Sequence, residues 1–474
     1  MEAKTFTVKT AAVRGAEAAP VVAEVSAAPG LPGISIVGMA DASVLEARSR
    51  VRCALRASGY ELPRAAVVIS LSPADMRKAG SCFDLPIAVG VLAATGQIPT
   101  GWLDGCLFAG ELALDGTVLP ARGSVALQQL AASQGLALAT GKGADALAGC
   151  GECLSLSTLA DLRAGKSGAA PIPPASPEPT RPLDFSDIHG CETAKRAVAV
   201  AVAGGHSIAL VGDTAPCRAA IAARIPSIMP AMSADDVRAA ARIHSVCGEP
   251  VSSIAAGSRP FRSPAPCIST AGFVGGGRPV RPGEVSLAHA GVLYLDDAAE
   301  WDRVKLQMMR MPMEEGAVRI VRADGACSMP ARFQLVVGAD SCPCGGYGRR
   351  DAECRCPETR VLRYRDAAAG RMLCAGAKMI AHIEVGGGDA SGMDSAELRR
   401  MVERARSFAA ARGDYPGSMT KKAADFINRS ARKMGIDPMR VRDIARTIAD
   451  MDESGRIRMR HAREAAAYTL GRKL

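Results

Sequence analysis

A short segment in the middle of the chain has the spacing of a phosphate-binding loop. The apolar run 208–211 predicts a buried strand, Gly212 opens a loop, and a helix is predicted from Arg218 to Ile225. In the working motif, G-x-x-x-x-G-K-[ST], glycines expose backbone N–H groups, the lysine reaches the terminal phosphates and the hydroxyl holds Mg²⁺. The candidate residues for binding ATP and its Mg²⁺ are Gly212, Asp213, Thr214, Ala215, Pro216, Cys217, Arg218 and Ala219.

This segment keeps little of the motif's chemistry. Gly212 matches, but Cys217 stands at the second glycine, Arg218 at the lysine and Ala219 at the hydroxyl residue. Arginine keeps the positive charge, yet its planar, bulkier head is not a conservative replacement for lysine. Taken alone, the segment also fits an ordinary strand–glycine–helix junction of an α/β domain.

Two carboxylates follow a second apolar strand, predicted at 291–295. Asp296 is the candidate Mg²⁺ ligand, and Asp297 is the candidate catalytic acid that would polarise water. A buried strand followed by a polar turn would have the same sequence pattern.

Four cysteines form two C-x-C pairs, Cys342 with Cys344 and Cys354 with Cys356, separated by nine residues. Two thiolate pairs across a tight loop can give closed tetrahedral S₄ coordination, which indicates structural zinc. Redox chemistry is the alternative, but the strand–helix context of a thioredoxin motif is missing.

The composition favours a large protein of the cytoplasm. With 474 residues, 48% of them hydrophobic, the chain can form two or three cores. It has no uncharged apolar run of 18 residues, so no membrane partner is expected. The first ten residues alternate polar and apolar like a strand and lack the apolar centre of a signal peptide. The fifteen cysteines are too dilute to indicate a disulfide scaffold.

Positive charge is concentrated at the C-terminal end. Residues 399–474 contain 19 Lys/Arg and 9 Asp/Glu, a net charge of +10 that equals the net charge of the whole chain. The spacing of these residues predicts helices with cationic faces, which suit phosphate backbones; a merely solvated basic surface is equally compatible. The candidate DNA-binding residues are Arg456, Arg458 and Arg460.

A proline-rich stretch divides the chain. Residues 164–182 include six prolines and predict a semi-rigid linker. Before it, short strands alternate with amphipathic helices, which indicates an α+β or α/β domain. The predicted units are 1–163, the linker 164–182, an α/β domain at 183–390 and a basic helical domain at 391–474.

Long phrases along the chain resemble the competence protein ComM / YifB family, the bacterial AAA+ proteins often labelled magnesium-chelatase-like. The matching phrases include GLPG at 30–33, RVRCAL at 50–55, LSPADMRK at 71–78, FDLPIA at 83–88, AGGH at 203–206, RPGEVSLAH at 281–289, PARFQLV at 330–336 and ARTIAD at 445–450. So many matches in one order are specific for the family, though not for its activity.

The resemblance implies an α/β fold class with a Lon-protease-like N-terminal α+β domain, an AAA+ α/β domain and a C-terminal helical domain. It also implies a hexameric ring ATPase that binds DNA and promotes branch migration during natural transformation. The family shares the two C-x-C pairs, which supports zinc. In the Lon-like domain, the nucleophile position falls near Cys82 and the lysine position near Val125, so a binding or scaffolding role is expected there rather than proteolysis.

Departures from the family gather where ATP would be handled. Asp297 replaces a glutamate, and the sensor asparagine falls at Asp340, which adds a negative charge near the γ-phosphate. The arginine-finger segment, 372–385, has a small insertion and no arginine; the arginine of the second sensor falls at Ile436. The paired histidines of the family's PHH motif fall at Ala265 and Pro266.

These changes predict impaired or lost ATP hydrolysis, since a missing arginine finger alone costs roughly 10³–10⁵ in rate. Three alternatives stay open: an ATPase that tolerates the substitutions, a non-catalytic scaffold in a mixed ring with another AAA+ protein, and a metal-chelatase-like subunit.

Overall fold

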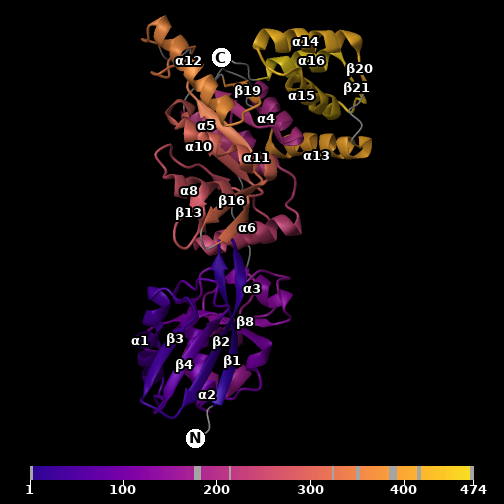
Figure 1. The fold of residues 1–474 in the computed structure, drawn as a ribbon. Helices are drawn as coiled ribbons and strands as arrows, with labels where there is room; N and C mark the ends of the chain where they lie inside the picture. Colours follow the sequence, from indigo (N-terminus) through magenta and orange to yellow (C-terminus); the bar gives the residue numbers. More distant parts are fainter. Residues whose placement is uncertain are drawn as a thin grey trace.

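The computed structural model describes residues 4–175, 183–212, 215–322, 325–348, 353–383, 392–413 and 418–469. These residues form a mixed α/β structure with three parts along an elongated shape (Figure 1). An N-terminal unit lies at one end, a unit built on a parallel sheet lies in the middle, and a helical C-terminal part packs beside the far end of that sheet. No helix within these ranges has both the length and the apolar content needed to cross a bilayer.

The N-terminal unit contains two four-stranded sheets. In the first, with order β1-β2-β4-β3, the long β1–β2 hairpin is antiparallel and β3 runs parallel to β4. In the second, with order β10-β9-β8-β5, strands β5, β8 and β9 are parallel. The strands are β1 (Lys4–Arg14), β2 (Glu17–Ala28), β3 (Gly33–Val37), β4 (Ala66–Ser72), β5 (Cys106–Phe108), β6 (Gly110–Leu112), β7 (Val118–Pro120), β8 (Ala137–Gly141), β9 (Cys153–Leu156) and β10 (Ala170–Pro171).

Helices fill the space around these sheets. Every residue of α2 (Asp84–Ala94) is buried, which matches its almost entirely apolar sequence. By contrast, α1 (Ala42–Ala57) is amphipathic, with a buried face that includes Val44, Val51 and Leu55. The other helices are α3 (Ser124–Ser133) and the 3₁₀ segments η1 (Ser81–Phe83), η2 (Leu103–Gly105) and η3 (Leu159–Gly168).

Part of the stretch predicted as a linker, 164–182, lies in the N-terminal unit. Residues 164–168 complete η3, and β10 pairs antiparallel with β9. Residues 176–182 lie outside the described ranges, so the linker itself stays a prediction.

The central unit is built on a five-stranded parallel sheet with order β12-β15-β18-β11-β19. Its inner strands are continuous buried runs, apolar except for Gln334 at the start of β18, as expected for a parallel sheet covered on both faces. The strands are β11 (Ile208–Val211), β12 (Phe261–Arg262), β15 (Val292–Leu295), β18 (Gln334–Ala339) and β19 (Met379–His382). Two antiparallel hairpins project from the unit: β13 (Gly275–Gly276) with β14 (Arg281–Pro282), and β16 (Ala317–Arg322) with β17 (Gly325–Pro330).

The helices of the central unit connect these strands. The longest ones are amphipathic or buried, while α12 projects away from the body of the unit (Figure 1). They are η4 (Phe185–Asp187), α4 (Glu192–Gly204), α5 (Ala215–Ile228), α6 (Ala234–Cys247), α7 (Ser252–Ala255), α8 (Thr270–Val274), α9 (Glu284–Leu287), η5 (Ala298–Glu300), α10 (Arg303–Gln307), α11 (Arg310–Glu315) and α12 (Glu358–Cys374).

The C-terminal part is helical. Its apolar faces join the core of the central unit, because residues of both parts belong to one cluster of buried side chains that includes Val198, Val402 and Ile448. Its elements are α13 (Ser395–Arg412), β20 (Ser418–Met419), α14 (Lys421–Met434), α15 (Pro438–Met451), β21 (Arg456–Ile457) and α16 (Met459–Ala467).

The tip of the β1–β2 hairpin inserts into the central unit. Ala16, at the turn, is fully buried and belongs to the same apolar cluster as Phe273 and Met329. The backbone N–H of Gly15 donates to the carbonyl of Val280 at 3.2 Å. Beside it, α3 packs against α6, and the backbone N–H of Val125 donates to the hydroxyl of Ser245 at 3.2 Å. The first two units are therefore joined by an apolar plug and by hydrogen bonds.

Candidate nucleotide-binding site

The segment with the phosphate-loop spacing lies at the carboxyl end of β11. Gly212 follows the strand with φ +102°, a conformation that favours glycine, and an added Cβ would lie 2.9 Å from the carbonyl oxygen of Ile383. Asp213 and Thr214 lie outside the described residues. The helix begins at Ala215, three residues before the predicted start, so the segment from Ala215 to Ala219 forms the first turns of α5.

The candidate carboxylates meet at the same edge of the sheet. Asp296 and Asp297 follow β15, and Asp340 follows β18. Strand β18 lies between β15 and β11, and all three run parallel, so their carboxyl ends are adjacent. This edge is where ligands of open α/β sheets are usually bound.

Arg218 lies among these three carboxylates. Its side chain is completely buried. Its Nη1 donates to Oδ1 of Asp340 at 2.5 Å, and its Nε and Nη2 each donate to Oδ1 of Asp296 at 3.2 Å. Nη2 also lies 3.6 Å from Oδ1 of Asp297. Among the candidate acids that the structure describes, Asp296, Asp297 and Asp340, one internal cation therefore contacts all three.

The electrostatics keep this guanidinium charged. Burial lowers the pKa of Arg218, but the charges of Asp296 and Asp340 and the hydrogen bond to Asp340 outweigh burial, so its pKa is raised above the ordinary arginine value. The pKa of Asp297 is raised from its usual value by burial and by the neighbouring charge of Asp296. Asp297 is also strained, because its backbone is left-handed with φ +51°.

These residues do not fit a Mg²⁺–nucleotide. The side chain of Ala219 has no oxygen to offer the metal, and the oxygens of Asp296 and Asp340 that would face the metal and phosphate accept from Arg218. A nucleotide phosphate at this edge would have to displace the buried guanidinium from its three carboxylates. The arrangement is a closed ion cluster, and no chemical step can be derived for ATP from it.

The positions of the second sensor, the arginine finger and the paired histidines lie in other elements than the Arg218 cluster. Ile436 lies between α14 and α15 and packs partly buried against the C-terminal core, where it can offer no charge. Residues 372–374 end α12, and Glu384 and Val385 of the finger segment lie outside the described residues. Ala265 and Pro266 lie between β12 and α8.

The four candidate zinc ligands come together as the spacing predicts. The Sγ atoms of Cys342, Cys344, Cys354 and Cys356 all lie within 4.8 Å of one another. Cys342 Sγ is 3.4 Å from Cys344 Sγ and 3.7 Å from Cys354 Sγ, and Cys344 Sγ is 3.7 Å from Cys354 Sγ. Tetrahedral zinc with Zn–S bonds of about 2.3 Å would hold its sulfurs about 3.8 Å apart, so the donor set fits this metal.

Hydrogen bonds favour a thiolate at one position of this cluster, Cys344, whereas desolvation and hydrogen bonds with neighbouring thiols raise the pKa of Cys354 and Cys356. The backbone N–H of Gly346 and neighbouring thiols lower the pKa of Cys344 to about 6. The backbone N–H of Tyr347 donates to the sulfur of Cys342 at 3.3 Å. A metal would need such thiolate ligands, and backbone donors orient them. None of these four cysteines forms a disulfide in the part of the chain that the structure describes.

The candidate DNA residues are exposed, but they do not form one helical face. Arg456 lies in β21, Arg458 caps α16 and Arg460 lies in its first turn, so the prediction that they share a helix is wrong for the first two. The reason is that Ile457, between them, is buried in the core and fixes a short extended segment. Arg460 Nη2 pairs with Asp452 Oδ2 at 3.0 Å, and Arg456 Nε donates to Ser418 Oγ at 3.1 Å.

The nucleophile position of the N-terminal unit is inert. Burial raises the pKa of the Cys82 thiol to about 12, helped by the negative charge of Asp84. Val125 is fully buried and forms no basic partner. A thiol that stays protonated and has no adjacent base is a poor nucleophile.

Sequence reasoning missed the pairing of Arg218 with Asp340. Taken separately, Arg218 is a poor substitute for lysine and Asp340 is an extra negative charge near phosphate. The sequence does contain a signal for this pairing. A basic residue, Arg218, and an acidic residue, Asp340, stand at two positions that are expected to lie around the same phosphate.

Comparisons with known proteins agree with this architecture. The family model "Magnesium chelatase, subunit ChlI" matches residues 184–375, and the model "Subunit ChlI of Mg-chelatase" matches residues 23–139. The uncharacterized protein YifB of Escherichia coli strain K12 is 33% identical over 97% of this chain and 96% of its own length. The competence protein ComM of Haemophilus influenzae is 31% identical over 96% of this chain and 95% of its own.

Proposed function

Because the chain belongs to the ComM/YifB family of magnesium-chelatase-like proteins, we propose that it is a DNA-associated AAA+ protein whose nucleotide site does not hydrolyse ATP. In this proposal the chain forms a hexameric ring, its N-terminal unit is a Lon-protease-like domain without peptidase activity, and its family role is DNA branch migration during natural transformation.

The single observation that carries the proposal is the buried ion cluster around Arg218. Its guanidinium is fully enclosed and contacts Asp296, Asp297 and Asp340. Removing one charge-assisted hydrogen bond costs about 1.5–3 kcal/mol, so separating the cation from these acids would consume much of the binding free energy of a nucleotide. Ala219 would provide no Mg²⁺ ligand in return.

A second candidate function is a non-catalytic scaffold in a mixed ring with an active AAA+ protein. The closed cluster favours it, because an internal cation can hold the sheet edge in shape where other subunits use Mg²⁺ and phosphate. Structural zinc at the four cysteines is compatible with both proposed functions, because it would order the loop after β18 without taking part in catalysis.

The deciding experiment measures ATP turnover of the full-length protein, alone and with branched DNA. The proposal expects no DNA-stimulated turnover above background, with the Asp296→Asn variant giving the same background. Turnover of about 1 s⁻¹ or more that is abolished by Asp296→Asn would overturn it. Absence of turnover together with co-purification of an active AAA+ partner would select the scaffold.

A further inference from the structure

Strand β3 is an open edge of the first sheet of the N-terminal unit (Figure 1). Within the described ranges it pairs only with β4, in parallel. The backbone N–H of Gly33 donates to the carbonyl of Ala65 at 3.3 Å, so alternate residues from Gly33 onward turn their polar backbone groups toward β4. Ile34 and Ile36 turn theirs to the open side, where no other described strand or loop bonds them.

The opposite edge of the same sheet is protected. Strand β1 contains Lys4 and Lys9, and lysines on an edge discourage pairing with another chain. It also lies against β5 and η2, and Nζ of Lys9 donates to the carbonyl of Asp104 at 2.9 Å. Natural sheets usually guard their edges in one of these ways, so an edge with neither protection needs an explanation.

The edge at β3 has neither protection. No charged residue occurs from Ala27 to Ala40, a stretch that contains all of β3. Within this stretch Leu31, Val37 and Met39 are 92%, 50% and 57% exposed. A single exposed apolar residue is ordinary, but three of them beside an unpaired strand form a surface to which another extended chain can add.

A groove begins where β3 begins. Its volume is about 470 Å³, and it lies between the start of β3, Arg52 of α1 and the segment 61–64 that precedes β4. Apolar side chains line most of it: Pro32, Ile34, Leu62 and Pro63. A groove of this size beside an open strand can receive a side chain of a peptide that pairs with that strand.

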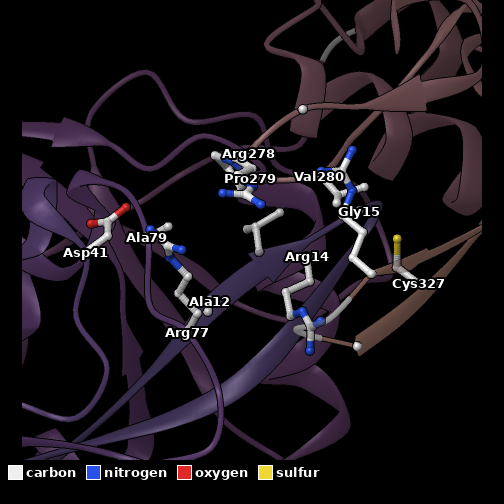
Figure 2. A pocket seen from close by; sticks show the side chains of 14 residues that line it. Ala12, Arg14, Gly15, Asp41, Arg77, Ala79, Arg278, Pro279, Val280 and Cys327 are labelled. Atoms are coloured by element: carbon white, nitrogen blue, oxygen red, sulfur yellow. The ribbon is translucent and has the colours of Figure 1, made fainter. Parts of the chain in front are cut away.

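This groove is separate from the contact between the two units. The register of the sheet places Gly33 level with Ala66 and Ala28, at the end remote from the turn that inserts into the central unit. Asp41, which follows the other end of β3, and Arg278 of the central unit line the same space between the units (Figure 2). The first residues of β3 are therefore free of that contact.

The charges around the groove determine which partner fits. Arg52 and Arg64 supply two positive charges, and Glu61 supplies one negative charge. Arg48 and Arg56 lie one turn of α1 to either side of Arg52, and both are exposed. As exposed side chains these arginines need no partner for stability, but they make the surface beside β3 attractive to carboxylates.

The same charges disfavour a second copy of this chain as the occupant. Antiparallel pairing of two β3 strands would place both α1 helices on one face of the joined sheet. Their rows of arginine would then lie close together, and like charges repel. An acidic partner reverses the sign of that interaction.

We propose that the open edge of β3 binds an extended segment of another protein, with alternating apolar and acidic residues, as an added strand of this sheet. The outward N–H and C=O groups of Ile34 and Ile36 would form the main-chain hydrogen bonds. The groove would take an apolar side chain, and Arg52 and Arg64 would receive carboxylates. This inference goes beyond the proposed function, because it depends neither on ATP nor on DNA.

The test uses the full-length protein and two fluorescent peptides of about six residues, the usual length of a strand. One alternates valine with glutamate and the other alternates valine with lysine. We expect the glutamate peptide to bind about tenfold more tightly in anisotropy titrations. Arg52→Glu/Arg64→Glu should reverse that preference, whereas Arg360→Glu/Arg363→Glu, which changes two exposed arginines of α12, should leave it within about twofold.

Hydrogen exchange locates the contact. With saturating glutamate peptide, the backbone amides of Ile34 and Ile36 should exchange at least about tenfold more slowly. The amides of Ser35 and Val37 already face β4 and should change little. Circular dichroism checks that the charge variant is folded, as expected because Arg52 and Arg64 are both exposed.

The proposal is overturned if neither peptide binds, if the charge variant behaves like its control, or if binding leaves the amides of Ile34 and Ile36 unprotected. Protection of these amides that appears without peptide and rises with protein concentration would also overturn it, because the edge would then be occupied by a second copy of the chain.

Discussion

Nη1 of Arg218 and Oδ1 of Asp340 lie 2.5 Å apart, although the residues are 122 positions apart in sequence. Arg218 and Asp340 form a pair, and Asp296 and Asp297 place two further carboxylates beside the same guanidinium. The site is therefore better described as an ion cluster centred on the Arg218 guanidinium than as a nucleotide site that has only lost contacts.

Breaking this cluster should destabilise the fold. Arg218→Met leaves three neighbouring carboxylates without their cation, and we expect a loss of about 2–4 kcal/mol in the free energy of unfolding, reduced from the fully buried case because the acids are partly exposed. Denaturant unfolding measures it, with exposed Arg360→Met as the control. Adding Asp340→Asn to Arg218→Met should recover part of the loss; no recovery would show that the two residues are not coupled.

Restoring the motif should restore nucleotide binding before hydrolysis. The triple variant Arg218→Lys/Ala219→Thr/Asp340→Asn removes the internal guanidinium and supplies a hydroxyl for Mg²⁺. We expect nucleotide affinity to rise at least about tenfold, read with a fluorescent ATP analogue. Turnover should stay low because no finger arginine is supplied. Equal affinity for the wild type and the triple variant would mean that Arg218 does not block the site.

The cysteine cluster should carry about one zinc per chain, measured by elemental analysis of protein purified without added metal. Cys344→Ser and Cys354→Ser should each lower the zinc content and the Tm, since three sulfurs cannot close the site. Cys53→Ser is the control, because Cys53 is exposed and far from the cluster in sequence. Zinc-free protein in which all four thiols are alkylated in the native state would contradict this prediction.

DNA affinity should depend steeply on salt if the C-terminal arginines contact phosphates. Charge reversal at Arg456, Arg458 and Arg460 should flatten the log–log slope by about 2–3, because each lost contact removes about 0.9. Because Arg460 already pairs with Asp452, the Arg456→Glu/Arg458→Glu variant should carry most of the effect. Arg56→Glu serves as the control. A slope that does not change with these residues would assign the basic surface to solvation only.

Acid should loosen the contact between the central sheet and the C-terminal helices. Burial lowers the pKa of His206 to about 4, and its Nε2 lies 2.8 Å from the hydroxyl of Thr447 in α15. The unfolded chain binds the proton near pH 6.5 and the folded chain only near pH 4, so stability falls as the pH decreases through this window, by about 3 kcal/mol for a fully buried site. His206→Gln should reduce that decline in unfolding measurements at pH 4–7 and leave the part due to His289, whose pKa burial also lowers to about 4; an unchanged pH profile would exclude His206 as a cause.

The local elements could be predicted from the sequence because their patterns are local. The strand predicted at 208–211 is confirmed to the residue. The cysteine cluster could also be predicted from the sequence, since its four candidate ligands lie within fifteen residues of one another in the chain.

Contacts between distant segments could not be predicted in the same way. The ion pair of Arg218 with Asp340 depends on β18 lying between β15 and β11, an order that no periodicity reveals. The extended path of Arg456–Ile457 is set by burial of a single isoleucine in a core formed by other helices. Each of these features is decided by tertiary packing rather than by propensity.

The buried turn at Ala16 limits how the molecule can move. A domain tethered only by a proline-rich stretch could swing freely, but here a hairpin of the first unit is anchored in the apolar interior of the second. Any rotation between them must first extract that turn and expose the surfaces around Phe273 and Met329 to water. The N-terminal and central units should therefore move as one rigid body. A force applied to the N-terminal unit would then be transmitted to the edge of the central sheet, because no hinge lies at this junction.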